Sequence, residues 1–138
     1  MAKVQLNFPE PVLFTTQLDV RITDLNYGNH LGNDRVLSLL HEARVRFLKH
    51  LGFSEMDLGG AGVIMADATI QFKQEVFYGE LLEISIAVTD ISRAAFTICY
   101  RVTSAGNLVA LAKTGMVCYN YQTHKVASIP ELFLQRLN

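Results

Sequence analysis

The sequence predicts an α+β domain in which an antiparallel β-sheet wraps around one long helix. The first observation behind this fold class is the order of periodic segments: one strand, one long amphipathic helix and then four strands. The second is length, because 138 residues, of which 50% are hydrophobic, suffice for one core and are too few for two. We therefore expect a single domain over residues 1–138.

The composition excludes several classes of partner. Charged residues make up 18% of the chain and the formal net charge is -1, so there is no basic field of the kind that binds nucleic acid. The apolar runs are short and the N-terminal residues lack the apolar segment of a signal peptide, so we expect a soluble, cytoplasmic protein without a membrane span. Cys99 and Cys118 lack CxxC or metal-ligand spacing, and we expect buried thiols with no metal and no redox cofactor.

The first segment is expected to be extended. Pro9 and Pro11 disfavour a helix within residues 1–16. A strand should follow at residues 17–22, where Leu18, Val20 and Ile22 alternate with polar residues in the two-residue period of a sheet with one buried face.

A long helix should begin at Asn33 or Asp34, either of which can act as the N-cap, and end at Gly52. Apolar residues recur along it at steps of four and three, which places them on one face: Val36, Leu40, Ala43, Phe47 and Leu51. We expect the sheet to cover this face. His41 and Arg44 should lie on the polar flanks, in solvent or against a neighbouring subunit.

Strands dominate after a glycine-rich connection over residues 53–62. The alternation of apolar residues predicts them at 63–72, 82–89, 95–103 and 108–121. A turn at residues 104–107 joins the last two. A short helix is expected over residues 130–137, opened by Pro130.

The loop from Asp24 to Gly32 is where we expect chemistry. It is rich in residues that tolerate a cramped or left-handed backbone. The first N–H groups of the following helix have no intrahelical partner, so they and the loop side chains can converge on one ligand atom. These polar side chains belong to Asp24, Asn26, Asn29, His30 and Asn33.

The segment VRITDLNYGNHLGNDRVLSLLHEARVRFLKHLGF carries a family resemblance. It resembles the signature of the hotdog-fold acyl-CoA and acyl-carrier-protein thioesterases of the 4-hydroxybenzoyl-CoA thioesterase type, roughly V-R-x-x-D-x-D-x-x-G-H-V-N-N followed by an apolar helix with an E-A-R step. The later segments IQFKQEVFYGELLEI and ISRAAFTICYRV resemble the strands of that family, so the similarity covers nearly the whole chain. The resemblance implies a hotdog fold, paired protomers with the thioester bound between them, and hydrolysis of that thioester.

The chain departs from this pattern at the position of the usual catalytic acid. Asn26 occupies the second acidic position, Asn29 replaces a glycine and Gly32 replaces the first asparagine of the N-N pair. An amide can orient a water molecule but cannot take its proton. The leading hypothesis is an acyl thioesterase; the alternatives are a hotdog protein that binds acyl thioesters without hydrolysing them, and, less favoured by the motif, a hotdog dehydratase.

The expected catalytic roles follow from what thioester hydrolysis requires. The N–H groups near Gly32 and Asn33 should polarise the carbonyl, as the resemblance implies for Asn33. His30 and Asp24 are the candidate bases, with Asn26 holding the water. Glu42 is a further candidate on the helix. Asp24 can instead cap the loop through backbone N–H groups, and Glu42 can instead pair with Arg46.

The substrate implied by the resemblance is a small-molecule acyl thioester, with coenzyme A as part of the substrate and no other cofactor. Tyr27 and Gly32 are candidate substrate-binding residues, and Lys73 and Arg93 are candidate contacts for the phosphates of coenzyme A. Each of these two cations is equally well explained as a residue facing solvent. An acyl carrier protein is a possible partner, and we expect a homodimer or a dimer of dimers.

Overall fold

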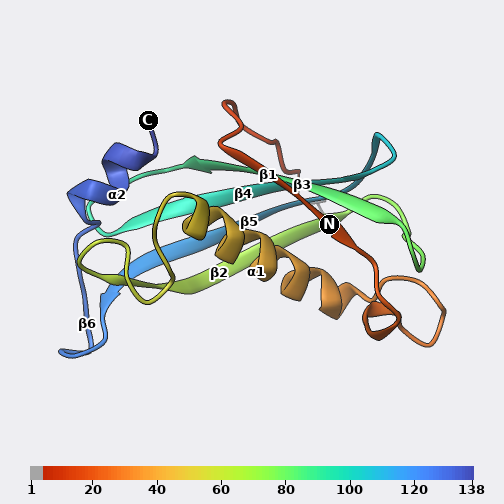
Figure 1. Ribbon diagram of the computed structural model, residues 1–138, viewed down its shortest axis with the longest axis horizontal. Helices are drawn as coiled ribbons and strands as arrows, with labels where there is room; N and C mark the ends of the chain where they lie inside the picture. The colour runs from red at the N-terminus through yellow and green to blue at the C-terminus, as the bar shows by residue number, and fades with distance from the viewer. Residues whose placement is uncertain (1–4) are drawn as a thin grey trace.

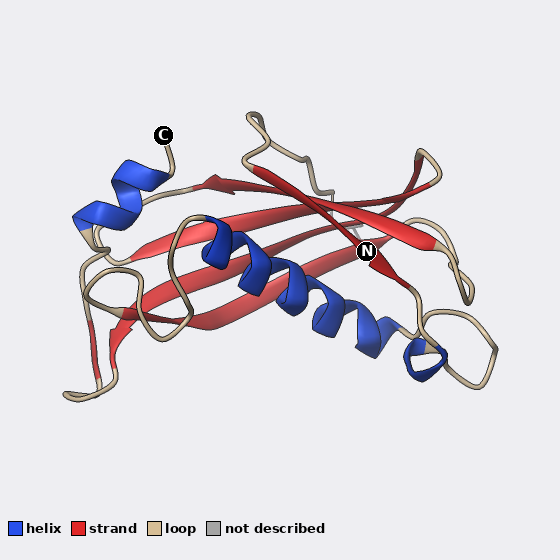
Figure 2. Ribbon diagram, viewed as in Figure 1, coloured by secondary structure: helices blue, strands red, loops and turns tan. Residues whose placement is uncertain are grey.

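The computed structural model describes residues 5–138 and contains one sheet, one long helix and one short helix (Figures 1 and 2). The chain runs through strand β1 (Phe14–Asp19), the 3-10 turn η1 (Ile22–Asp24) and helix α1 (Asn33–His50). The remaining elements are β2 (Gly62–Phe72), β3 (Leu81–Thr89), β4 (Ala95–Ser104), β5 (Asn107–Asn120), β6 (Lys125–Val126) and α2 (Glu131–Arg136).

All strand pairs are antiparallel, and the sheet order is β1-β3-β4-β5-β2, with β6 paired to β5. Helix α1 lies across one face of this sheet (Figure 1). The predicted α+β architecture, one antiparallel sheet on one long helix, is therefore confirmed. The two edges of the sheet are β1 and β2.

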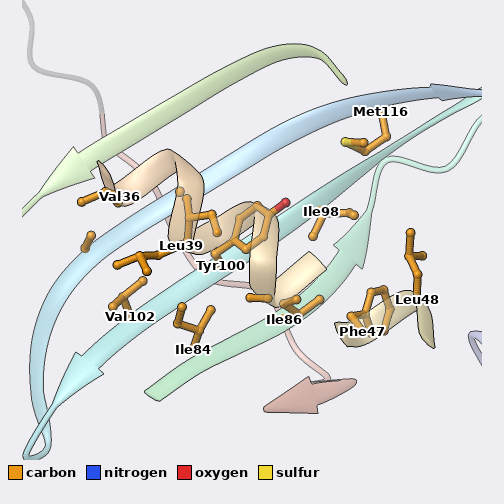
Figure 3. Close-up of a cluster of buried hydrophobic side chains, with 14 of the residues drawn as sticks. Val36, Leu39, Phe47, Leu48, Ile84, Ile86, Ile98, Tyr100, Val102 and Met116 are labelled. Atoms are coloured by element: carbon orange, nitrogen blue, oxygen red, sulfur yellow. The ribbon is translucent and has the colours of Figure 1, made fainter. Parts of the chain in front are cut away.

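The core fills the space between α1 and the sheet (Figure 3). The predicted apolar face of the helix is buried, since Leu40, Ala43 and Phe47 are each 0% exposed. They meet alternate residues of β3 and β4, which include Ile84, Ile86, Ile98, Tyr100 and Val102. The spacing of four and three in the helix and of two in the strands explains why these side chains meet.

The N-terminal segment covers part of the opposite face of the sheet. The Leu6 N–H donates to the Gln71 side chain over 3.3 Å, and the Arg101 guanidinium lies over the Phe8 ring at 4.6 Å. The extended lead-in expected over residues 1–16 ends in β1, which begins at Phe14; residues 1–4 of it lie outside the described residues.

The helix leaves the edge strand β2 partly uncovered. Its backbone approaches β1 and β3 more closely than β2. Met65, Ala68 and Phe72 are paired with β5 residues Met116, Thr114 and Ala110, all of them buried. Residues directly opposite in an antiparallel pair share a face, so these three residues of β2 face the helix side of the sheet. They are nevertheless exposed.

Four local expectations were wrong. The N-cap of α1 is Gly32 instead of Asn33 or Asp34. The first strand covers Phe14–Asp19 instead of 17–22, and Ile22 lies in the 3-10 turn with 68% of its surface exposed, because the chain leaves the sheet after Asp19. The two-residue strand β6 was not predicted. Arg44 is only 5% exposed, although it was placed on a polar flank.

Candidate active site

The loop before α1 is closed by Asp24. Its carboxylate accepts hydrogen bonds from the Arg21 N–H at 2.8 Å and from the Arg21 guanidinium at 3.4 Å, and the residue is 3% exposed. Its carbonyl oxygen accepts the Gly32 N–H at 3.0 Å. The capping role expected for Asp24 as an alternative to catalysis is therefore confirmed, and the carboxylate is engaged within the loop.

Asn26 organises the turn that carries His30. The Asn26 side-chain oxygen accepts the N–H of Gly28 at 2.8 Å and the N–H of His30 at 3.4 Å, while the Asn26 N–H donates to the His30 carbonyl at 2.9 Å. The turn places Asn29 at φ 64, in the left-handed region that asparagine tolerates. A residue with a longer side chain could not make this set of bonds, so Asn26 has a structural role that is independent of its predicted role toward water.

The amino terminus of α1 offers two free donors. The N–H groups of Asn33 and Asp34 have no hydrogen-bond partner within residues 5–138, whereas the N–H of Arg35 returns to the Gly32 carbonyl. Gly32 is the buried N-cap, and a Cβ there would lie 2.6 Å from Asp34 Oδ1 and 3.6 Å from Asn26 Cβ. A side chain at Gly32 would collide with the Asp34 carboxylate, which lies beside the helix start where the helix dipole favours negative charge.

A cavity of about 330 Å3 opens at this helix start. It lies between the loop, the first turn of α1 and the end of β2, so it combines helix-terminal donors with titratable side chains. Its lining consists of His30, Leu31, Asn33, Val36, Phe72, Lys73, Gln74, Glu75, Val76 and Val109.

The His30 ring is held at the edge of this cavity. Nδ1 lies 3.4 Å from the Leu31 carbonyl oxygen and 3.5 Å from the Asn26 side-chain nitrogen, and Nε2 lies 3.9 Å from a Glu75 carboxylate oxygen. The ring packs edge-on against Phe77. When Nδ1 carries the proton and donates to Leu31, Nε2 keeps a free lone pair and can accept a proton.

The other sequence-predicted site residues divide into near and distant groups. Lys73 lines the same cavity as His30 and Asn33. Tyr27 is fully exposed and does not line this cavity. Arg93 donates to Ser128 at 2.9 Å near the end of β5, whereas Val109 of the cavity lies near the start of β5, so Arg93 is at the opposite end of the sheet.

Glu42 lies on the side of α1 that faces β1, away from His30. It lines a groove of about 380 Å3 together with Gln17, Arg21 and Arg46. Its carboxylate accepts the Arg46 Nε–H at 2.9 Å, which confirms the predicted ion pair at a spacing of four. The helix therefore does not bring Glu42 to the cavity at its amino terminus.

A polar network that the sequence did not reveal runs through the middle of α1. Arg44 Nε donates to Glu55 at 2.9 Å and Arg44 Nη1 donates to the Tyr100 hydroxyl at 3.2 Å. His41 Nε2 lies 2.6 Å from the other Glu55 oxygen, and the Tyr100 hydroxyl lies 2.8 Å from Thr114 Oγ1. The burial of Arg44 could have been predicted from the sequence, because Arg44 follows Leu40 by four residues and precedes Leu48 by four, which places it on the apolar face. Glu55 lies in the irregular connection, where no periodicity could place it.

The electrostatics of this network favour the charged forms of its ion pair. Burial alone would lower the pKa of Arg44 and raise the pKa of Glu55. The contacts of Arg44 with Tyr100 and Glu55, and those of Glu55 with His41 and Arg44, outweigh burial. The pKa of Arg44 is therefore raised and that of Glu55 is lowered. The pKa of Tyr100 is raised, chiefly by burial.

Three further features of the described residues concern metal ligands, membrane helices and thiols. Between residues 5 and 138, no three His, Cys, Asp or Glu side chains are grouped so that they could hold a metal ion. No helix there is long and apolar enough to cross a membrane. Both cysteines are buried free thiols, as predicted, and burial raises the pKa of Cys118 to about 11.

Comparison with known proteins shows the family to which the chain is related. The model of the thioesterase-like superfamily matches residues 20–137. A relative described as a putative esterase, from Aquifex aeolicus, is 32% identical over 92% of this chain and 98% of its own length. A 1,4-dihydroxy-2-naphthoyl-CoA hydrolase from Synechococcus elongatus is 29% identical over 81% of this chain and 85% of its own.

The fold is shared with a solved thioesterase structure. A 1,4-dihydroxy-2-naphthoyl-CoA thioesterase from Synechocystis superposes with a TM-score of 0.81 at 23% identity, over 90% of this chain and 94% of that one. This match confirms the hotdog architecture that the sequence motif implied.

Proposed function

This chain belongs to the thioesterase-like superfamily of thioester hydrolases, and we propose that it hydrolyses a coenzyme A thioester of an aromatic or short aliphatic acid to the free acid and thiol. The observation that carries the proposal is the pair of unpartnered N–H groups, of Asn33 and Asp34, at the start of α1 beside the cavity that His30 lines. The aromatic acyl group is suggested by relatives that act on 1,4-dihydroxy-2-naphthoyl-CoA. An acyl-carrier-protein thioester would present the same reacting group.

The helix start supplies the electrostatic part of catalysis. The thioester carbonyl oxygen accepts hydrogen bonds from the Asn33 and Asp34 N–H groups, which are fixed by the helix and need no rearrangement as negative charge develops. The positive end of the helix dipole acts in the same direction. Removal of one such donor typically lowers kcat by a factor of roughly 100 to 1,000.

His30 acts as the proton acceptor, because the neutral amide of Asn26 cannot take a proton. With Nδ1–H donating to the Leu31 carbonyl, Nε2 takes a proton from water as the water oxygen bonds to the carbonyl carbon. Collapse of the tetrahedral intermediate breaks the C–S bond, and the thiolate takes the proton from the imidazolium. Asn26 fixes the turn that carries the His30 ring through its side-chain oxygen, which accepts the Gly28 and His30 N–H groups. Lys73 lines the same cavity, and its positive charge would attract the negatively charged coenzyme A thioester.

A homodimer would complete the site. The edge strand β2 has no strand partner on its outer side among the described residues, so its backbone beyond Val63 is a template for pairing with a second copy. Ile64, Met65 and Phe72 expose 38%, 40% and 46% of their surfaces on this strand. We expect light scattering to give at least twice the mass of the 15.4 kDa chain.

The test is release of free thiol from benzoyl-CoA and from short acyl-CoAs. His30→Ala should lower kcat by roughly 100-fold or more, the scale of a lost general base, with little change in binding of the substrate. The matched control is His50→Ala, an exposed histidine at the far end of α1. Tight acyl-CoA binding by the parent protein without any turnover would instead establish the second candidate, a non-hydrolytic binding protein, which the amide at Asn26 favours.

A further inference from the structure

A carboxylate lies beside His30 in the cavity at the helix start. Glu75, in the loop between β2 and β3, lines this cavity together with His30 and Asn33. One of its carboxylate oxygens is 3.9 Å from Nε2 of His30, the nitrogen that takes the proton in the proposed function. The side chain of Glu75 is 68% exposed, and its carboxylate accepts no hydrogen bond from residues 5–138, so its lone pairs are available to a water molecule.

The backbone on both sides of Glu75 is held by hydrogen bonds. The two residues before it donate their N–H groups to the Val109 carbonyl of β5, at 2.8 and 3.3 Å. The carbonyl of Val76, the residue after it, accepts the Leu31 N–H at 2.7 Å. Val76 itself is buried, with 1% of its surface exposed. The loop that carries Glu75 is therefore fixed to the sheet and to the loop before α1, which keeps the carboxylate beside the imidazole.

The 3.9 Å separation fits a bridging water molecule better than a direct bond. A hydrogen bond between a ring nitrogen and a carboxylate oxygen spans about 2.7–3.2 Å. A water oxygen about 2.8 Å from both atoms would see them at an angle of about 90°, near the angle between its own two O–H bonds. Both O–H groups could then point at these two acceptors, which leaves the lone pairs of the water oxygen free to attack.

The other carboxylates that the sequence suggested for catalysis are engaged elsewhere. Asp24 is buried and accepts hydrogen bonds from Arg21. Glu42 binds Arg46 on the side of α1 that faces β1. Of these three carboxylates, Glu75 is the one that lines the cavity.

We propose that Glu75 is a further catalytic residue, which holds the attacking water together with His30 and supplies the carboxylate that the amide of Asn26 cannot be. This rests on the proposed function. As the water oxygen bonds to the carbonyl carbon, one of its protons passes to Nε2 of His30, and the carbonyl π electrons move to the oxygen held by the helix amides. Glu75 accepts the hydrogen bond of the second O–H and stabilises the positive charge that forms on the ring.

The experiment measures thiol release from benzoyl-CoA by variants of Glu75. Glu75→Ala removes both the acceptor and the charge, and should lower kcat roughly 100-fold with KM within about threefold. Glu75→Gln keeps an acceptor oxygen without the charge, and should lower kcat roughly tenfold. The matched control is Glu83→Ala, an exposed glutamate of β3 that does not line the cavity, which should keep the wild-type kcat.

A double variant separates this role from a structural one. Because His30 and Glu75 act on the same water molecule, adding Glu75→Ala to His30→Ala should lower kcat less than threefold further. Thermal unfolding checks that each variant is folded, and Glu75→Gln, which preserves the size of the side chain, carries the comparison if Glu75→Ala is destabilised.

The results distinguish failure of this proposal from failure of the proposed function. If the wild type releases thiol and a folded Glu75→Gln keeps its kcat within about twofold, or if the losses of His30→Ala and Glu75→Ala multiply, the role of Glu75 is refuted and the proposed function stands. If the wild type releases no thiol from any acyl-CoA, both are refuted.

Discussion

Replacement of Glu55 by Gln should destabilise the protein strongly although Glu55 lies outside every regular element. The change keeps the size of the side chain and leaves the Arg44 guanidinium, 5% exposed, without its anionic partner. Removal of one partner of a buried ion pair costs about 3–5 kcal/mol, mostly because the remaining charge stays buried. The side chain of Glu55 is 26% exposed and Arg44 keeps the Tyr100 hydroxyl, so we expect the lower end, about 3 kcal/mol.

Urea denaturation at pH 7 measures this difference, at one protomer concentration because oligomerisation would shift the midpoint. The melting temperature should fall by roughly 10 °C. The pH dependence of the free energy of unfolding provides an independent test. The pKa of Glu55 is lowered in the folded protein from its ordinary value of 4.5, so the stabilisation is fully present above that value and is lost as the pH falls through the lowered pKa. The difference between wild type and Glu55→Gln should therefore shrink below about pH 4.5.

The control is the double variant Arg44→Met with Glu55→Gln. Because it removes the buried charge together with its partner, its loss of stability should be smaller than the sum of the two single losses. Equal stability of wild type and Glu55→Gln at pH 7, within about 0.5 kcal/mol, or additive losses in the double variant, would show that the Arg44–Glu55 contact contributes little and that the reasoning is wrong.

Two further predictions concern other buried polar groups. Tyr100→Phe should lower the free energy of unfolding by about 1–3 kcal/mol, because it removes the hydroxyl that binds both Arg44 and Thr114 and leaves their polar atoms buried; chemical denaturation measures it. Cys118 should react with a thiol reagent at pH 8 far more slowly in the native protein than in denaturant, because burial raises its pKa to about 11 and thiolate is the reactive form; fast native labelling would contradict this.

Local patterns were sufficient to predict most of the fold. The four- and three-residue spacing from Val36 to Phe47 placed the helix within two residues of its ends, and alternation placed the four strands after it. Ile22 misled the prediction of the first strand, because its alternation with Leu18 and Val20 continues one step past the point where the chain turns away from the sheet. The two residues of β6 are too few for any period to be visible.

The candidate site was predictable only where it is local in sequence. The loop and the helix start are contiguous, so turn chemistry and the motif located Asp24, His30 and Asn33 together, and the structure brings His30 and Asn33 to one cavity. Lys73 joins them through the register of β2, a long-range contact that the sequence could suggest only through the family resemblance.

The interactions of Glu55 show why the rest of the polar network could not be predicted from the sequence. A buried arginine requires an acidic partner, so the position of Arg44 on the apolar face implied that one existed. Nothing in the sequence said which of the 13 acidic residues it was, because the partner sits in a connection whose path is fixed only by the turn from α1 into β2. The Arg44–Glu55 contact stabilises the packing of the helix on the sheet. Glu55→Gln should therefore lower stability strongly, whereas His41→Ala should lower it by less, since Arg44 keeps its partner.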